Sequence, residues 1–400
     1  MFESTLTNVI AIDTDGEAIH FFSSDKGNQK NVRHDTYSYR ARPFDEEFFD
    51  KFGHILKLHC EQNPGAQLSK VSLILPDQVF LMDTVNIPTI QKSAMNTSLG
   101  LAIHNIYKNA NDLEYKTYTA AQNKQFTTYG LVGVRKDLIA KLKKVCADHQ
   151  VSIGNITFFA NAASNGAFVL NPKLKNASFM LLDIKEKASR FSIVVKGRTV
   201  GYYYLPFGYA ILSRNRLTAE DLLFDHSPAE LLVLNAKEKA KAKQLTVGEE
   251  VAAMESYSEE EENTSDEPEK SFEIDEDDFE TKYSAGFNKK VARKLPKFML
   301  RDTPSGKEAY AYENFRIFMK WTLDLYHNNA STVNLGTLDT VYVNMPSENS
   351  FLFDMVNEEI EENKLRFAPL VDSRNQDKTT ENLDLFGGFY VKQYDKTNNF

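Results

Sequence analysis

The sequence predicts an α/β protein built from two similar lobes. Apolar strand patterns alternate along the chain with amphipathic helix patterns, which is typical of α/β architecture. A strand–turn–strand pattern with an aspartate after its first strand occurs near the start of each half, at residues 7–22 and at residues 178–205. This repeat indicates an internal duplication. A chain of 400 residues is long enough for two lobes, each with its own core.

The first half alternates short apolar runs with helix patterns. Phe48, Phe52 and Ile55 recur at the three-and-four spacing of a helix face. Pro76 and Pro88 bracket an extended stretch, because neither proline can continue a helix. The expected elements are strands at 7–13, 18–22 and 71–75, a helix at 45–61, the extended stretch 76–88, a helix at 92–108, two strands between 113 and 134, and a helix at 136–149.

The second half begins with three apolar runs, and Lys196-Gly197-Arg198 is expected to form the hairpin turn between the second and third. The expected strands are 178–182, 191–195, 200–205 and 340–344, and the expected helices are 312–327 and 350–364. The first of these strands is followed directly by Asp183. The segment 383–391 and the polar tail after it lack the apolar face of a membrane-binding helix.

The formal charge of −9 comes from one segment of the chain. Residues 249–282 hold sixteen acidic and two lysine side chains, so the rest of the chain carries 45 basic and 40 acidic side chains. Repulsion between like charges predicts a disordered loop here. The remainder is an ordinary mixed surface, which argues against nucleic-acid binding.

Several function classes lack their sequence signatures. Cys60 and Cys146 form no CxxC pair, and the eight histidines show no zinc-ligand spacing, so we expect neither a disulfide scaffold nor a metal site. Ser305-Gly306-Lys307-Glu308 departs from a phosphate-binding P-loop, because Arg301 and Glu308 stand where glycine and a hydroxyl are needed. The sequence contains no long apolar run or signal peptide, so we expect a cytoplasmic protein without direct membrane insertion.

The two aspartate turns are the best candidates for a ligand site. Asp13, Thr14 and Gly16 form the first turn, and Asp183 and Lys185 belong to the second. Backbone N–H groups of such turns can hold phosphates, and a leading aspartate can hold Mg²⁺ through water. Two ordinary β-turns without a ligand are the competing interpretation.

Two groups of motifs carry a resemblance to a known family. The first is Leu75-Pro76-Asp77 with Val85-Asn86-Ile87-Pro88. The second is Leu182-Asp183-Ile184 continuing through Gly197-Arg198 to Leu205-Pro206-Phe207-Gly208. Together they resemble the PilM family, the actin-like cytoplasmic proteins of type IV pilus assembly, with the FtsA family as a more distant relative. The resemblance implies a two-lobed actin-like, ribonuclease-H-like fold. The first lobe would span 1–176 with a small α+β insert at about 71–150, and the second would span 177–400 with the disordered acidic loop at about 247–285.

The resemblance also implies partners and a place in the cell. Proteins similar to PilM bind ATP between their lobes and bind, at the insert, the cytoplasmic N-terminal tail of a bitopic PilN-type membrane protein. We therefore expect a cytoplasmic scaffold held at the inner face of the membrane through this partner. The candidate partner-binding residues are Val79, Leu81, Val85 and Ile87, whose stretch could pair edge to edge or line an apolar groove. The alternative is that this stretch is an interior strand.

The nucleotide motifs depart from the family pattern. Asp15 and Lys185 stand where the family's two Asp-x-Gly turns have glycine, and Asn344-Met345-Pro346 replaces its Gly-Gly. A larger residue at such a turn blocks positive φ and fills the phosphate space. We therefore expect a pseudo-ATPase without catalytic residues, in which Mg-ATP binds weakly or not at all.

Two other functions stay open at this point. The first is an active ATP-binding filament or switch protein, in which Asp13 and Asp183 hold Mg²⁺. The second is an unrelated enzyme of the same superfold, such as a sugar kinase, which would need intact phosphate turns. A homo-oligomer stays open as well. Gly387-Gly388 could supply a displaced nucleotide contact, although a glycine pair is more often a turn.

Overall fold

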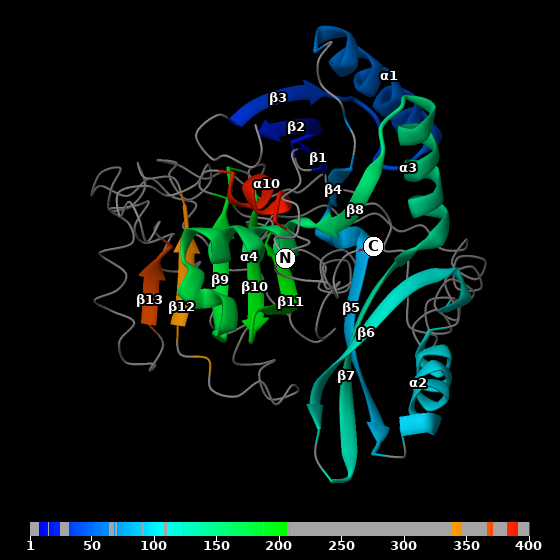
Figure 1. Ribbon diagram of the computed structural model, residues 1–400, viewed down its shortest axis with the longest axis vertical. Helices are drawn as coiled ribbons and strands as arrows, with labels where there is room; N and C mark the ends of the chain where they lie inside the picture. Colours follow the sequence, from blue (N-terminus) through cyan, green and yellow to red (C-terminus); the bar gives the residue numbers. More distant parts are fainter. Residues whose placement is uncertain are drawn as a thin grey trace, which may run out of the picture.

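The computed structural model describes most of the first half of the chain and parts of the second. The described residues are 8–14, 16–24, 32–63, 68, 70–89, 92–107, 110–122, 124–186, 188–205, 208, 338, 340–345, 366–370, 382–390 and 400. They form an α/β fold with three separate sheets (Figure 1).

The first sheet is the centre of the first lobe. Its five strands lie in the order β3-β2-β1-β4-β8, and β1 pairs antiparallel with β2 but parallel with β4. Their bounds are β1 Asn8–Asp13, β2 Ala18–Ser24, β3 Val32–Ser38, β4 Val71–Leu75 and β8 Ile153–Phe158. Every residue of β4 is buried, as expected for a central parallel strand.

The second sheet repeats the strand order of the first. Its order is β11-β10-β9-β12-β13, with β9 antiparallel to β10 and parallel to β12. The bounds are β9 Phe179–Ile184, β10 Ser189–Val195, β11 Arg198–Leu205, β12 Thr340–Asn344 and β13 Arg366–Pro369. The strand–turn–strand repeat seen in the sequence therefore corresponds to equivalent hairpins, β1–β2 and β9–β10, in two equivalent sheets.

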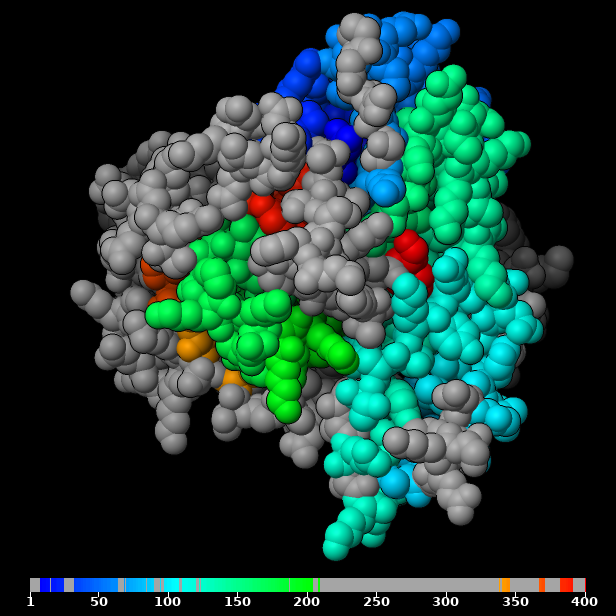
Figure 2. All heavy atoms as spheres, viewed as in Figure 1, coloured from blue at the N-terminus to red at the C-terminus, as the bar shows by residue number. Residues whose placement is uncertain are grey.

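A smaller subdomain interrupts the first lobe between β4 and β8. It contains the three-stranded antiparallel sheet β5-β7-β6 and the helix α2. The bounds are β5 Phe80–Pro88, α2 Lys92–Ile106, β6 Leu113–Gln122 and β7 Phe126–Arg135, and we call Phe80–Arg135 the insert. Figure 2 shows it as the cyan and teal projection at the lower right. The predicted insert of 71–150 also covers β4 and α3, which belong with the first sheet.

Two helices cover one face of the first sheet. They are α1, Glu46–Gln62, and α3, Lys136–Asp148, which pack on each other. Helix α1 begins where the Asp45 carboxylate accepts a hydrogen bond from the Phe48 N–H at 2.8 Å, which satisfies a backbone donor of the first turn. The buried positions of both helices follow the predicted three-and-four spacing.

A second pair of helices joins the lobes. Helix α4, Phe159–Leu170, directly follows β8 and is buried along its whole length. The short helix α10, Leu383–Gly388, packs across it. A Cβ atom on Gly387 would fall 1.8 Å from the Ala162 carbonyl oxygen, and one on Gly388 would fall 2.8 Å from Ile74. The two glycines therefore serve close packing, not a turn.

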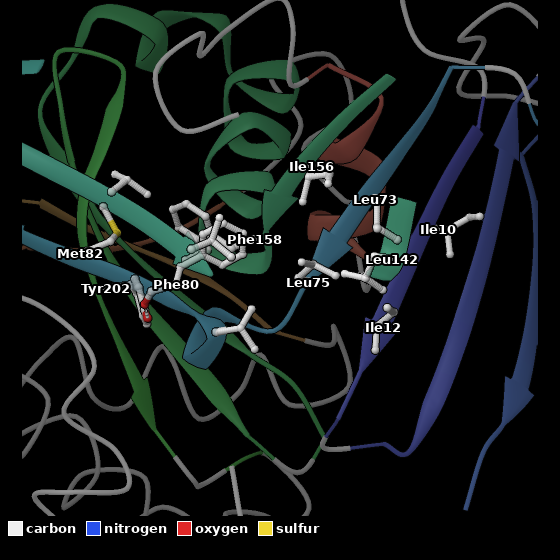
Figure 3. Close-up of a cluster of buried hydrophobic side chains, with 14 of the residues drawn as sticks. Ile10, Ile12, Leu73, Leu75, Phe80, Met82, Leu142, Ile156, Phe158 and Tyr202 are labelled. Carbon is white, nitrogen blue, oxygen red and sulfur yellow. Dashed lines mark hydrogen bonds between the residues drawn. The ribbon is translucent and has the colours of Figure 1, made fainter. Parts of the chain in front are cut away.

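The main hydrophobic core runs continuously from the first sheet into the second. Figure 3 shows Ile10, Leu73 and Ile156 of the first sheet at one end of the cluster and Tyr202 of the second sheet at the other. Phe80 and Phe158 lie between these groups, with ring centres 5.0 Å apart. One core therefore fixes the insert and both lobes together.

Strands β3, β8 and β13 and helices α4 and α10 were not predicted, and several predictions cannot be compared with the structure. Strand β3 is a polar edge strand, and β13 has four residues, so neither produces a clear apolar pattern. The predicted helices at 312–327 and 350–364 and the acidic loop at about 247–285 lie outside the described residues.

Candidate functional site

Four polar residues meet where the central strands of the two sheets end. Asp13 ends β1, Asp77 follows β4, Asp183 lies near the end of β9, and Asn344 ends β12. Because these strands are parallel within each sheet, their carboxyl ends share one edge, which is where open α/β sheets place ligands. We call these four residues, together with His20, Lys185, Arg190 and Asp384, the interlobe site.

A buried ion pair connects the lobes beneath this site. The Arg190 Nε atom of β10 donates to Asp77 Oδ2 at 2.7 Å, and both side chains are almost fully buried, with exposed fractions of 6% and 0%. The other oxygen of Asp77 accepts the Ala160 N–H at the start of α4 at 2.7 Å. The Tyr202 hydroxyl of β11 donates to the Asp77 carbonyl oxygen at 2.6 Å. Asp77 therefore joins the first sheet, the linking helix and the second sheet.

The first predicted phosphate turn is held by its own aspartate. Thr14 is half-buried and Gly16 is exposed, while Asp15 lies outside the described residues. A Cβ on Gly16 would fall 2.6 Å from Asp13 Oδ2, so glycine leaves room for this carboxylate to lie over the turn. Burial alone would raise the pKa of Asp13, but the His20 hydrogen bond and the charge of Arg190 outweigh burial and lower the pKa to about 2. Asp13 is therefore ionised.

The second predicted turn is closed by internal contacts. Asp183 Oδ1 accepts a hydrogen bond from the Asn344 amide at 2.7 Å, and Oδ2 accepts none from the described residues. The Lys185 N–H donates to the Ala188 carbonyl at 3.0 Å, so the hairpin itself uses this backbone donor. The Lys185 backbone N–H is therefore already bonded within the hairpin, whereas a phosphate-binding turn would need it to face the phosphate.

The Lys185 ammonium group lies between two carboxylates from different parts of the chain. Its Nζ atom is 3.0 Å from Asp384 Oδ1 and 3.7 Å from Asp183 Oδ2. The lysine side chain is 22% exposed, whereas both carboxylates are buried. In the sequence-based alternative Asp183 would hold Mg²⁺ together with Asp13, whereas in the structure the Lys185 ammonium lies beside Asp183. Among the residues that the structure describes, no group of three acidic, histidine or cysteine side chains could hold a metal.

The charges of Lys185, Asp183 and Asp384 partly offset the cost of burying one another. Burial alone would lower the pKa of Lys185, but the charges of Asp183 and Asp384 outweigh it and raise the pKa. Burial opposes ionisation of Asp384, yet Lys185 and Arg190 lower its pKa below the usual value. Burial raises the pKa of Asp183. The Lys185 ammonium, 3.7 Å away, lowers this pKa by less than burial raises it.

Sequence reasoning identified one half of this site and missed the other. Arg190 could have been found as a cation inside an apolar strand, and Asp77 as an aspartate after a strand, like Asp13. Nothing in the sequence places Asp384 beside Lys185, because the two residues are 199 positions apart.

The candidate partner-binding residues lie at the insert, mostly inside it. Val79, Val85 and Ile87 are at most 3% exposed, and Leu81 is half-buried. Val85 and Ile87 pack with residues of α2 in the core of the insert. Strand β5 pairs with β7 on one side and with no other described strand, so it is an edge strand of its sheet. A partner would meet the strand edge and Leu81 before the buried side chains.

Comparison with known proteins establishes the fold. No protein-family model matches the sequence, and no curated protein does. The solved PilM-PilN type IV pilus biogenesis complex is similar over 97% of this chain and 98% of the other, with a TM-score of 0.53 and 10% identity. The fold is that of the actin-like ATPases, as the resemblance implied.

Two further solved structures are similar at lower scores. The cytoplasmic domain of EpsL, an inner-membrane component of the type II secretion system of Vibrio cholerae, is 10% identical, with a TM-score of 0.35 over 55% of this chain and 78% of that chain. The ethanolamine utilization protein EutJ from Carboxydothermus hydrogenoformans is 9% identical, with a TM-score of 0.39 over 97% of this chain and 90% of that chain.

None of the helices that the structure describes has the length and hydropathy needed to cross a membrane.

We predict that breaking the Asp77–Arg190 pair strongly destabilises the fold. Arg190→Met leaves a fully buried carboxylate without its cation and is expected to lower the free energy of unfolding by about 3–5 kcal/mol in urea titration. The matched control is Arg33→Met, which breaks the more exposed pair with Asp35 and should cost less than about 1 kcal/mol. Equal losses in the two variants would contradict the role given to Asp77.

We predict that Lys185→Met lowers stability in a pH-dependent way. Without the ammonium group, the folded-state pKa of Asp384 is expected to rise above its unfolded value, and that of Asp183, already raised by burial, is expected to rise further. Ionisation of both carboxylates then opposes folding as pH rises. The loss should be about 2–3 kcal/mol near pH 7.5 and should shrink towards pH 4.5.

Urea unfolding at both pH values measures this difference. Lys144→Met, at an exposed position of α3, is the matched control and should change little at either pH. A Lys185→Met penalty that is the same at both pH values would show that the ammonium charge does not compensate these carboxylates.

Proposed function

We propose that this chain is an actin-like scaffold of a type IV pilus or related secretion machine. In this proposal it binds the cytoplasmic tail of a PilN-type membrane protein through its insert, lies at the inner face of the membrane through that partner, and does not hydrolyse ATP. The observation that carries the proposal is the Lys185 ammonium group between Asp183 and Asp384. It supports a binding role over a catalytic one.

The interlobe site disfavours Mg-ATP on charge and space. Four carboxylates, those of Asp13, Asp77, Asp183 and Asp384, surround two cations, and both cations already pair within the protein. A Mg²⁺ ion would have to displace the Lys185 ammonium from Asp183, and an incoming phosphate would meet Asp384. The residues present therefore do not fit Mg-ATP as a resident ligand.

The similarity to the PilM-PilN complex supports the pilus part of the proposal. It extends over nearly the whole of both chains, and the solved structure is a complex of PilM with PilN. In the present chain the insert offers an edge strand, β5, to which an extended tail could add by main-chain pairing. Leu81, at the start of that strand, is the candidate residue with side-chain surface left to contact such a tail.

We predict that the tagged full chain recovers a bitopic protein with a short N-terminal cytoplasmic tail from detergent-solubilised membranes. The tail, made as a fluorescent peptide, should then bind the purified chain and slow amide exchange in β5. Leu81→Gln should weaken binding at least about tenfold, because about 1.4 kcal/mol of apolar contact is lost.

The control for this prediction is the same substitution elsewhere in the insert. Leu101, on α2, is 61% exposed, so Leu101→Gln should leave the affinity within about twofold. Equal effects of the two substitutions, or a tail that protects amides outside the insert, would contradict the proposed binding surface. Recovery of soluble metabolic proteins only would contradict the pilus role.

A further inference from the structure

Phe400, the last residue of the sequence, pairs with the outer edge of the first sheet. Its N–H donates to the Ile156 carbonyl oxygen at 2.8 Å, and the Ile156 N–H donates to the Phe400 carbonyl oxygen at 2.9 Å. Two residues that exchange both bonds form the antiparallel hydrogen-bonded pair of a β-ladder. Strand β8 is the last strand of its sheet among those described, so Phe400 lies where a further strand would add.

The Phe400 side chain is inserted between β8 and the insert. Its ring centre lies 5.7 Å from that of Phe80, the first residue of β5. The Lys116 Nζ atom of β6 lies 5.0 Å from the ring centre of Phe400. Figure 1 marks this end of the chain between β8 and β5. The edge of β8 at Ile156, the Phe80 ring and the Lys116 ammonium thus form one slot around an aromatic ring, which we call the aromatic slot.

The base of the slot belongs to the main hydrophobic core. Phe80 is fully buried, and its ring is 5.0 Å from that of Phe158, which follows Ile156 on β8. Figure 3 shows Phe80 and Phe158 together in the main core with Tyr202 nearby. Tyr202 donates a hydrogen bond to the Phe80 carbonyl at 3.0 Å. Removing Phe400 therefore leaves the site in place.

The chemistry of the slot selects its ligand. Main-chain pairing on a strand edge accepts any extended segment, and the side-chain pocket beside it determines which residue fits. A cation facing a ring favours an aromatic over an aliphatic side chain by about 0.5–1 kcal/mol at a partly exposed position. Phe400 is half-buried, so its ring is reachable by a competing ligand.

We propose that the aromatic slot is a docking site for an extended segment with an aromatic side chain, and that the chain's own Phe400 occupies it as a displaceable intramolecular ligand. An external peptide of the same chemistry then binds only by displacing Phe400. The docked segment pairs its main chain with β8, whereas the proposed tail pairs with β5, and the two sites meet at Phe80, next to Leu81. The proposal does not depend on the proposed tail binding, because its test uses the chain's own residues 391–400.

The test uses the full chain and a fluorescent peptide with the sequence of residues 391–400. Phe400→Ala empties the slot and should bind this peptide, while the wild-type chain should bind it at least tenfold more weakly, because an attached ligand competes at a high effective concentration. The same peptide with alanine in place of its final phenylalanine should bind neither protein. Equal binding of the peptide to both proteins, or no binding to Phe400→Ala, would overturn the proposal.

Hydrogen exchange provides a second readout in the same variant. The Ile156 amide should exchange faster in Phe400→Ala and regain its protection when the peptide is added. The Ile74 amide of the central strand β4 should be unchanged, which shows that the variant is folded. Protection of Ile156 that stays at the wild-type level in Phe400→Ala would show that Phe400 does not close this edge.

Discussion

The buried pair between Asp77 and Arg190 is the interaction on which the arrangement of the two lobes depends. Each oxygen of the Asp77 carboxylate has a different partner: Arg190 of the second sheet and the Ala160 N–H at the start of α4. The Arg190 guanidinium also lies 4.4 Å from the centre of the Phe159 ring. A charge pair this deep adds little net stability over apolar residues, but breaking it is costly. Its effect is to fix one geometry between the sheets.

That geometry brings like charges together, and the protein compensates them with its own cations. Asp13 ends β1 and Asp183 lies near the end of the equivalent strand β9, so the repeated fold places one carboxylate at the carboxyl edge of each sheet. In an ATPase of this fold such carboxylates would face Mg²⁺ and phosphate. Here Lys185 binds Asp384 and lies near Asp183, while Arg190 lowers the pKa of Asp13. The same internal cations, Lys185 and Arg190, would then stabilise the site and account for the proposed loss of nucleotide binding.

The sequence predicted the elements well and the site only in part. Strands β1, β4 and β9 and helices α1, α2 and α3 were predictable because their apolar spacing is strong and local. The repeated aspartate turns correctly indicated equivalent sheets. Strand β3 was missed because an exposed edge strand needs few apolar residues, and the contact of Lys185 with Asp384 was missed because it joins residues 199 positions apart. The glycine at 387 was read as a turn or ligand contact, whereas it packs on Ala162.

Binding of Mg-ATP to the full chain tests the central claim most directly, because we propose that the internal cation occupies carboxylates that the nucleotide's metal would need. Isothermal titration calorimetry with millimolar Mg-ATP should detect no binding, and thermal denaturation should show no stabilisation. A ligand present at 100 times its dissociation constant would stabilise the fold by about 2.7 kcal/mol. Saturable binding with a clear rise in melting temperature would contradict the claim that Lys185 has replaced the nucleotide's cation.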